Sequence, residues 1–184
     1  MAEYLIKEES LVEIADAVRT HFKYYDGVMG MLTDKKNLAS ITIPDDITRI
    51  GKCGLAYSGL TNVIIPDSVQ VIDNSAFADC NHLTSIILGQ YTLSIDRQAF
   101  SYCTELTNIA IPSTCMTIGY NAFRGCNNLT DIYMHSITPP TLANTEAIPS
   151  TTTIHVPIGG GDAYKTATNW SSFANKIVAD GQTS

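Results

Sequence analysis

The residue types that carry out most enzyme chemistry are few in this chain, and their spacing matches no catalytic motif. The four histidines are His21, His82, His135 and His155, and none has a metal-type partner three or four positions along the chain. The sequence contains no G-x-S-x-G motif, no P-loop and no paired-carboxylate motif. We therefore expect a protein that is not an enzyme, with no catalytic residues, no metal site and no cofactor.

Weaker possibilities remain open at three places. His135 and His155 could be neighbours near the end of the chain and serve a ligand or pH role. Asp73 and Asp96 recur at the same interval as the apolar positions described below and could attract a cation, although a solvated polar column explains them more simply. Gly159–Gly161 precedes Asp162 and could cradle a phosphate, but a flexible turn is the simpler interpretation.

Three of the five cysteines, Cys80, Cys103 and Cys126, recur at a constant interval. Stacked positions of neighbouring coils lie about 4.8 Å apart, which exceeds the Cβ separation of about 3.8 Å in a disulfide. We therefore expect reduced, buried thiols that pack as small hydrophobic side chains. There is no C-x-x-C motif, so a zinc or thioredoxin-like site has no support.

The cysteine interval is part of a repeat that fills positions 41–131 in rows of constant or nearly constant length. A fixed period of this kind is typical of a solenoid, in which each repeat stacks only on its neighbours. The recurring positions include Ile50, Ile72, Ile95 and Ile118, then Phe77, Phe100 and Phe123, then Leu60, Leu83, Leu106 and Leu129.

Each repeat contains an L-x-x-I-x-I segment whose alternation predicts a short strand of a parallel sheet. In the segment Leu83–Leu88, for example, Ile86 and Leu88 are predicted to point inward, and Ser85 and Ile87 outward. A second extended segment, V-x-x-I, follows in each repeat. The residues around Ala76–Cys80 then have the apolar spacing of one helical or 3-10 turn.

The pattern L-T-x-I-x-I-P-x-x-V-x-x-I-x-x-x-A-F-x-x-C-x-x-L over residues 36–135 resembles the BspA-type, or Treponema-type, leucine-rich repeat. This resemblance implies an α/β solenoid with short parallel strands stacked at a period of about 22–23 residues. It also implies a role like that of a bacterial cell-surface adhesin that binds host proteins. Gly89 replaces the recurring proline and Thr92 replaces valine in the same coil, so we expect a looser turn there.

The chain divides into two predicted regions. Residues 1–35 form a predicted N-terminal helical segment, and residues 36–184 form the solenoid, with an irregular loop at 136–153 and a C-terminal helical cap at 154–184. We expect Tyr164, Trp170, Phe173 and Ile177 to cover the open end of the solenoid.

The N-terminal segment has an apolar stripe at helical spacing, formed by Leu11, Ile14, Val18 and Phe22. The stripe either caps the first coil or acts as an anchor or assembly helix. The start of the chain also resembles a short opening segment of bacteriophage and prophage structural proteins.

The outward side of the predicted strands is the candidate binding face. One row across it contains Asn62, Ser85, Asn108 and Asp131, and the next contains Ile64, Ile87, Ala110, Tyr133 and His155. An exposed row with two isoleucines and a tyrosine is unusual on a monomer without a partner. The row either packs against an N-terminal element or another copy of the chain, or it binds a protein or glycan.

Composition excludes other classes of function. The net charge is −7 and the 11 lysines and arginines are scattered, which argues against a nucleic-acid partner. No long apolar run predicts membrane insertion, and MAEYLIKEES lacks the features of a signal peptide.

Together with the resemblances, the acidic composition and the lack of signal-peptide features favour a phage or prophage virion-associated protein of the tail or capsid surface. We expect this protein to be a homo-oligomer. The alternative is a BspA-type adhesin module on the extracellular surface of a bacterium.

Overall fold

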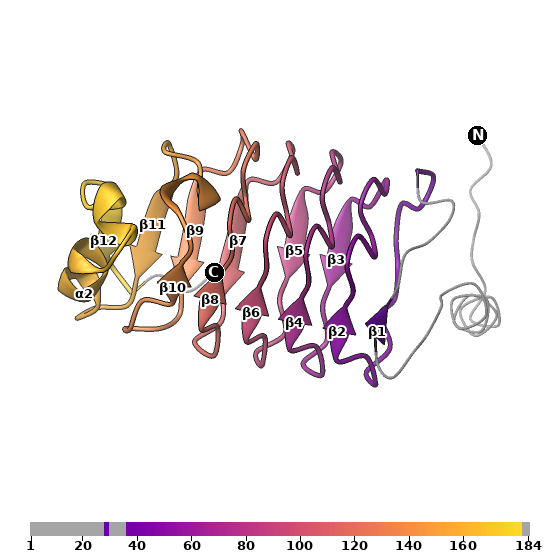
Figure 1. Ribbon diagram of the computed structural model, residues 1–184, viewed down its shortest axis with the longest axis horizontal. Coiled ribbons are helices and arrows are strands. Elements are labelled where there is room, and N and C mark those ends of the chain that lie inside the picture. Colours follow the sequence, from indigo (N-terminus) through magenta and orange to yellow (C-terminus); the bar gives the residue numbers. More distant parts are fainter. Residues whose placement is uncertain (1–27, 30–35, 182–184) are drawn as a thin grey trace.

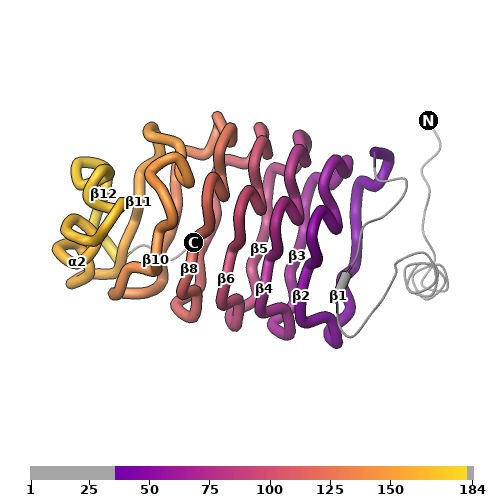
Figure 2. The backbone as a smooth tube through the Cα atoms, viewed as in Figure 1, coloured from indigo at the N-terminus to yellow at the C-terminus, as the bar shows by residue number. Residues whose placement is uncertain are grey.

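The protein is a parallel β-solenoid whose successive coils stack along one axis (Figures 1 and 2). The computed structural model describes residues 28–29 and 36–181. The predicted assembly residues Leu11, Ile14, Val18 and Phe22 lie outside the described residues, and so does nearly all of the predicted N-terminal segment.

One long side of the solenoid carries a six-stranded sheet in the order β1-β2-β4-β6-β8-β10. Its strands are β1 (Val28–Met29), β2 (Arg49–Ile50), β4 (Val71–Ile72), β6 (Ser94–Ile95), β8 (Thr117–Ile118) and β10 (Thr141–Leu142). All pairs are parallel, and Ile50, Ile72, Ile95, Ile118 and Leu142 lie in one register. The predicted isoleucine column is therefore confirmed.

The other long side carries the strands of the L-x-x-I-x-I segments, divided into two sheets. The first pairs β3 (Asn62–Ile64) with β5 (Ser85–Ile87). The second has the order β12-β11-β9-β7 and contains β7 (Asn108–Ile111), β9 (Asp131–Met134), β11 (Thr153–Val156) and β12 (Ile177–Ala179). The division lies between β5 and β7.

Stacked side chains of like type fill the core, as the repeat predicts. The ring centroids of Phe77 and Phe100 are 5.3 Å apart, and those of Phe100 and Phe123 are 5.4 Å apart, with nearly parallel planes. The five cysteines are free thiols. In the cysteine column the Cys103 thiol donates a hydrogen bond to the Phe77 carbonyl oxygen at 3.1 Å, and Cys126 donates to Phe100 at 3.0 Å. The thiols thus act as donors as well as apolar filling.

The Ala-Phe segment differs from the predicted helical or 3-10 turn. Ser75 and Asp79 have φ angles of 56° and 59°, in the left-handed region that interrupts a helix. The N–H of Phe77 donates to the Ala99 carbonyl of the next coil at 2.7 Å, whereas the N–H of Ala78 donates back to Ser75 at 3.1 Å. Alternate peptide groups therefore bind the neighbouring coil, as they do in a strand.

Residues 136–153, which the sequence analysis expects to form an irregular loop, run between the strands of another coil. Leu142 of β10 pairs in register with Ile118, and Ile154 of β11 pairs with Ile132. Between these strands lies the 3-10 turn η1 (Thr145–Ala147), where the Ala147 carbonyl accepts the N–H of Phe123 at 2.8 Å. The coil keeps its hydrogen bonds although its Thr- and Pro-rich sequence departs from the repeat.

The C-terminal end combines a six-residue helix α2 (Gly161–Thr166), a 3-10 turn η2 (Trp170–Phe173) and strand β12. The four predicted covering side chains, Tyr164, Trp170, Phe173 and Ile177, are buried. The Trp170 indole donates to the Pro140 carbonyl at 2.7 Å, and Tyr164 packs edge-on against Trp170. The end is covered, but only a small part of the covering segment is helical. None of the described helices is long and apolar enough to cross a membrane.

Candidate functional site

The outward side of β3, β5, β7, β9 and β11, here called the sheet face, brings the predicted binding residues into two rows. Parallel pairing places Asn62 beside Ser85 and Ile64 beside Ile87. Beyond the division between β5 and β7, the pairing aligns the remaining members: Asn108 with Asp131, Ala110 with Tyr133, and Tyr133 with His155. The predicted row membership is therefore confirmed within each of the two sheets.

The two isoleucines stand out of the sheet face. Ile64 is 67% exposed and Ile87 is 59% exposed, whereas the preceding residues Val63 and Ile86 are buried. This contrast follows from the alternation of side chains along a strand. Two large aliphatic side chains on adjacent coils therefore present apolar surface to solvent.

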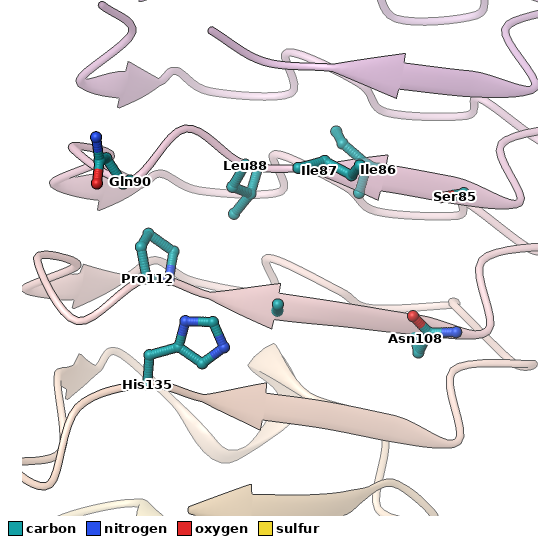
Figure 3. Close-up of a pocket in the computed structure, with 9 residues that line it drawn as sticks. Ser85, Ile86, Ile87, Leu88, Gln90, Asn108, Pro112 and His135 are labelled. Atoms are coloured by element: carbon teal, nitrogen blue, oxygen red, sulfur yellow. The ribbon is translucent and has the colours of Figure 1, made fainter. Parts of the chain in front are cut away.

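A groove lies at the division between β5 and β7 and is called here the β5–β7 groove (Figure 3). Its volume is about 410 Å³. Its lining residues are Ser85, Ile86, Ile87, Leu88, Gln90, Asn108, Ala110, Pro112 and His135. Figure 3 shows Asn108 at one end of the groove and Pro112 with His135 at the other.

The backbone at Gly89, just after β5, packs closely against the preceding coil. A Cβ atom on Gly89 would lie 2.4 Å from the Pro66 carbonyl oxygen, so only glycine permits this approach. The Gln90 backbone N–H and side-chain amide also donate to the Asp67 carboxylate at 2.8 and 2.7 Å. Leu88 is only half-buried, although Ile111, its equivalent on the next coil, is fully buried.

The turn at Gly89 is thus held closely, contrary to the looser turn that we expected. Thr92 of the same coil is buried, and its hydroxyl donates to the Val69 carbonyl at 3.4 Å. The opening lies instead on the far side of this coil, toward β7.

On the side toward β9 the groove is lined by the small side chain of Ala110 and by His135, whereas Tyr133, which pairs with Ala110 in the sheet, does not line it. The Tyr133 ring stacks on His155 with centroids 4.6 Å apart. His155 is fixed between two carboxylates, with Nε2 2.9 Å from Asp131 and Nδ1 2.8 Å from Asp180.

The carboxylates also set the protonation of this cluster. Burial alone would lower the pKa of His155, but hydrogen bonds and charge from Asp131 and Asp180 outweigh it and raise that pKa. The hydrogen bond from His155 in turn lowers the pKa of Asp131. The repeat pattern points to His155 and Asp131 but not to Asp180, whose position follows from the pairing of β12 with β11.

Two further hollows lie along the sheet face, of which the first adjoins the groove and the second adjoins the first. The first, of about 480 Å³, is lined by residues that include Asp45, Ile64, Asp67 and Ile87. The second, of about 450 Å³, includes Ile41, Asn62 and Ile64. Ile64 and Ile87 therefore project between neighbouring hollows. A surface of this shape suits insertion of a partner's side chains.

The charge of the sheet face is acidic. No lysine or arginine occupies an outward position on β3, β5, β7, β9 or β11. Asp67 lines the neighbouring hollow and accepts hydrogen bonds from Gln90, which lines the β5–β7 groove, and Asp131 pairs with Asn108, another lining residue. Lys176, just before β12, is the basic residue at the end of this face.

The other chemistry considered from the sequence finds simpler explanations. Both ring nitrogens of His155 contact carboxylates, so neither is available to activate a nucleophile. Asp73 forms an ion pair with Arg49 at 2.9 Å, and His82 is exposed near Glu105. Within residues 36–181, no group of three or more histidine, cysteine or acidic side chains could hold a metal ion.

Comparison with known families and structures gives three matches of interest. The model of the BspA type leucine rich repeat region matches residues 31–144 in six copies. A leucine rich cell surface protein from Faecalibacterium prausnitzii A2-165 is 26% identical, with a TM-score of 0.51 over 80% of this chain and 34% of its own. The pneumococcal vaccine antigen PcpA is 16% identical, with a TM-score of 0.64 over 88% of this chain and 44% of its own.

The chain therefore spans less than half the length of either solved structure. No curated protein sequence matches it.

Proposed function

This chain belongs to the BspA type leucine rich repeat family, and from this membership we propose that it is a non-catalytic module that binds a partner protein with its sheet face. The observation that carries the proposal is the pair of exposed isoleucines, Ile64 and Ile87, set between hollows. Exposed apolar side chains of this size favour a protein partner. Solenoids commonly use their extended strand surface for such binding.

We propose that the module lies on the surface of a bacterial cell. The support is the similarity to the Faecalibacterium prausnitzii cell surface protein, at 26% identity. On this proposal the module acts as an adhesin of the BspA type and recognises host proteins.

A virion-associated role on a phage tail or capsid surface is the second candidate. It rests on the resemblance of the first residues to an opening segment of phage and prophage structural proteins. Immunogold electron microscopy of the producing bacterium would distinguish the two: label on the cell envelope supports the adhesin, and label on released particles supports the virion protein.

The division of the chain into residues 1–35 and 36–184 is also a proposal, with Leu11, Ile14, Val18 and Phe22 as the assembly surface of a homo-oligomer. Light scattering of the full chain and of a Leu11→Asp/Ile14→Asp variant tests it. An oligomer that becomes a folded monomer supports assembly through this surface. Equal masses for the two proteins exclude it.

The proposed binding role is tested by probing arrays of extracellular proteins and of glycans with the labelled full chain. An Ile64→Asp/Ile87→Asp variant should lose its protein targets. A control variant, Met116→Asp/Tyr120→Asp, changes two exposed residues at the six-stranded sheet and should keep them. Binding to glycans alone, or equal loss in both variants, would count against a protein-binding sheet face.

A further inference from the structure

We infer that the β5–β7 groove is a specificity pocket for an extended segment of a partner protein, which inserts one aliphatic or aromatic side chain flanked by lysine or arginine. The inference rests on the proposed function and adds the chemistry of the partner.

The groove has the size and shape for a short segment. Its volume of about 410 Å³ lies toward the lower end of the roughly 300–1,000 Å³ that is usual for ligand pockets. It lies where the backbone ladder of the sheet face is divided. The backbone at Gly89 packs closely against the preceding coil, and Ala110 contributes only a small side chain to the lining.

The lining combines an apolar floor with hydrogen-bonding groups at its ends. Ile87, Leu88, Ala110 and Pro112 supply apolar surface for the inserted side chain. The remaining polar side chains of the lining, Ser85, Gln90, Asn108 and His135, can bond the backbone of an extended peptide. This is the usual composition of a site that takes an apolar anchor and orients the chain around it.

The charge around the groove selects basic flanking residues. Asp67 lies behind Gln90, and its carboxylate accepts hydrogen bonds from the backbone and side-chain amides of Gln90. Asp131 lies on the opposite side, next to Asn108, and the two carboxylates at His155 give that cluster a net negative charge whether or not the histidine is protonated. Since the outward strand positions hold no lysine or arginine, charge complementarity calls for cations on the partner.

The test is selection of a random peptide library against the full chain, followed by affinity measurements on single variants. Enriched peptides should carry an apolar residue next to lysine or arginine. Ala110→Phe fills the groove and should weaken binding by about tenfold or more. Ala110→Ser, a change of similar volume, should leave the affinity unchanged. Asn108→Lys, an exposed change that adds a cation, should also weaken binding, which keeps the test valid if Ala110→Phe fails to fold.

Several results would overturn the inference. These are no enriched peptide, enrichment without basic residues, or unchanged affinity in both Ala110→Phe and Asn108→Lys. Displacement of the peptides by a synthetic peptide of residues 1–27 would make the chain's own N-terminus the occupant. A smaller mass of Ala110→Phe in light scattering would make the occupant a second copy.

A result that refutes the pocket can be distinguished from a result that refutes the proposed function. Ile64 does not line the groove, so Ile64→Asp perturbs the sheet face alone. If a protein partner from the array is lost on Ile64→Asp but kept on Ala110→Phe, the sheet face binds and the pocket does not. If neither variant matters, both proposals fail.

Discussion

Ile86 and Ile87 are adjacent on β5 and chemically identical, yet we predict opposite consequences when each is changed to alanine. Ile86 is 5% exposed and packs in the core, whereas Ile87 is 59% exposed on the sheet face. Ile86→Ala should therefore destabilise the fold. Ile87→Ala should leave the fold nearly unchanged and weaken binding to the partner.

The magnitudes follow from burial. Truncation of a buried isoleucine to alanine costs about 2–5 kcal/mol, because apolar contacts are lost and a cavity remains. Full burial of such a side chain stabilises by about 1.5–3 kcal/mol, and Ile87 buries less than half of its surface. We therefore expect a loss of about 1 kcal/mol or less for Ile87→Ala.

Urea unfolding followed by circular dichroism and by the fluorescence of Trp170, the single tryptophan, measures both free energies. The binding affinity of the two folded variants is measured on the same preparations. Equal destabilisation by the two substitutions, or a larger effect from Ile87→Ala, would refute the assignment of inner and outer faces. Unchanged affinity of the folded Ile87→Ala variant would count against the sheet face as the binding surface.

Three further substitutions test the packing and the charges. Phe100→Ala removes the middle ring of the phenylalanine stack. It should lower the free energy of unfolding by about 3–5 kcal/mol in urea titrations. A loss below about 1 kcal/mol would contradict a buried, stacked position for this ring. Gly89→Ala places a methyl group against the Pro66 carbonyl and should destabilise by about 1–3 kcal/mol; a neutral effect in thermal unfolding would contradict the close approach. His155→Asn should remove the stabilisation that protonated His155 gains from Asp131 and Asp180. Because folding raises the pKa of His155, the wild type has this stabilisation in full below pH 6.5, the ordinary pKa, and loses it as the pH rises through the raised pKa. The lowered pKa of Asp131 adds a second contribution to the free energy of unfolding, which is lost as the pH falls below 3.8. If urea titrations give a difference in unfolding free energy between wild type and variant that does not depend on pH, this linkage is excluded.

The rows of the sheet face could be predicted because two periods coincide in the sequence. The repeat length places Ile64 and Ile87 in one column, and alternation along the strand turns Ser85 and Ile87 outward while Ile86 is buried. Nearly the same spacing also spans the predicted loop 136–153. Ile132 and Ile154 are separated by one repeat length and pair in register, but the Thr- and Pro-rich sequence between them concealed the coil.

The groove and the histidine cluster could not be predicted, because each depends on contacts between coils that no period encodes. Gly89 was visible as a departure from proline, but the sequence does not say toward which neighbouring coil a glycine will pack. Asp180 lies beyond the repeats and reaches His155 through the parallel pairing of β12 with β11. Its only sequence signal was the short apolar run that precedes it.

Site-specific photo-crosslinking tests the sheet face most directly. p-Benzoylphenylalanine is placed at position 64 on the sheet face, or at position 116, which is 66% exposed beside the six-stranded sheet. Each full-length protein is then illuminated with the partner identified on the array. We predict a covalent adduct from position 64 and none from position 116. An adduct from position 116 without one from position 64 would contradict binding through the sheet face.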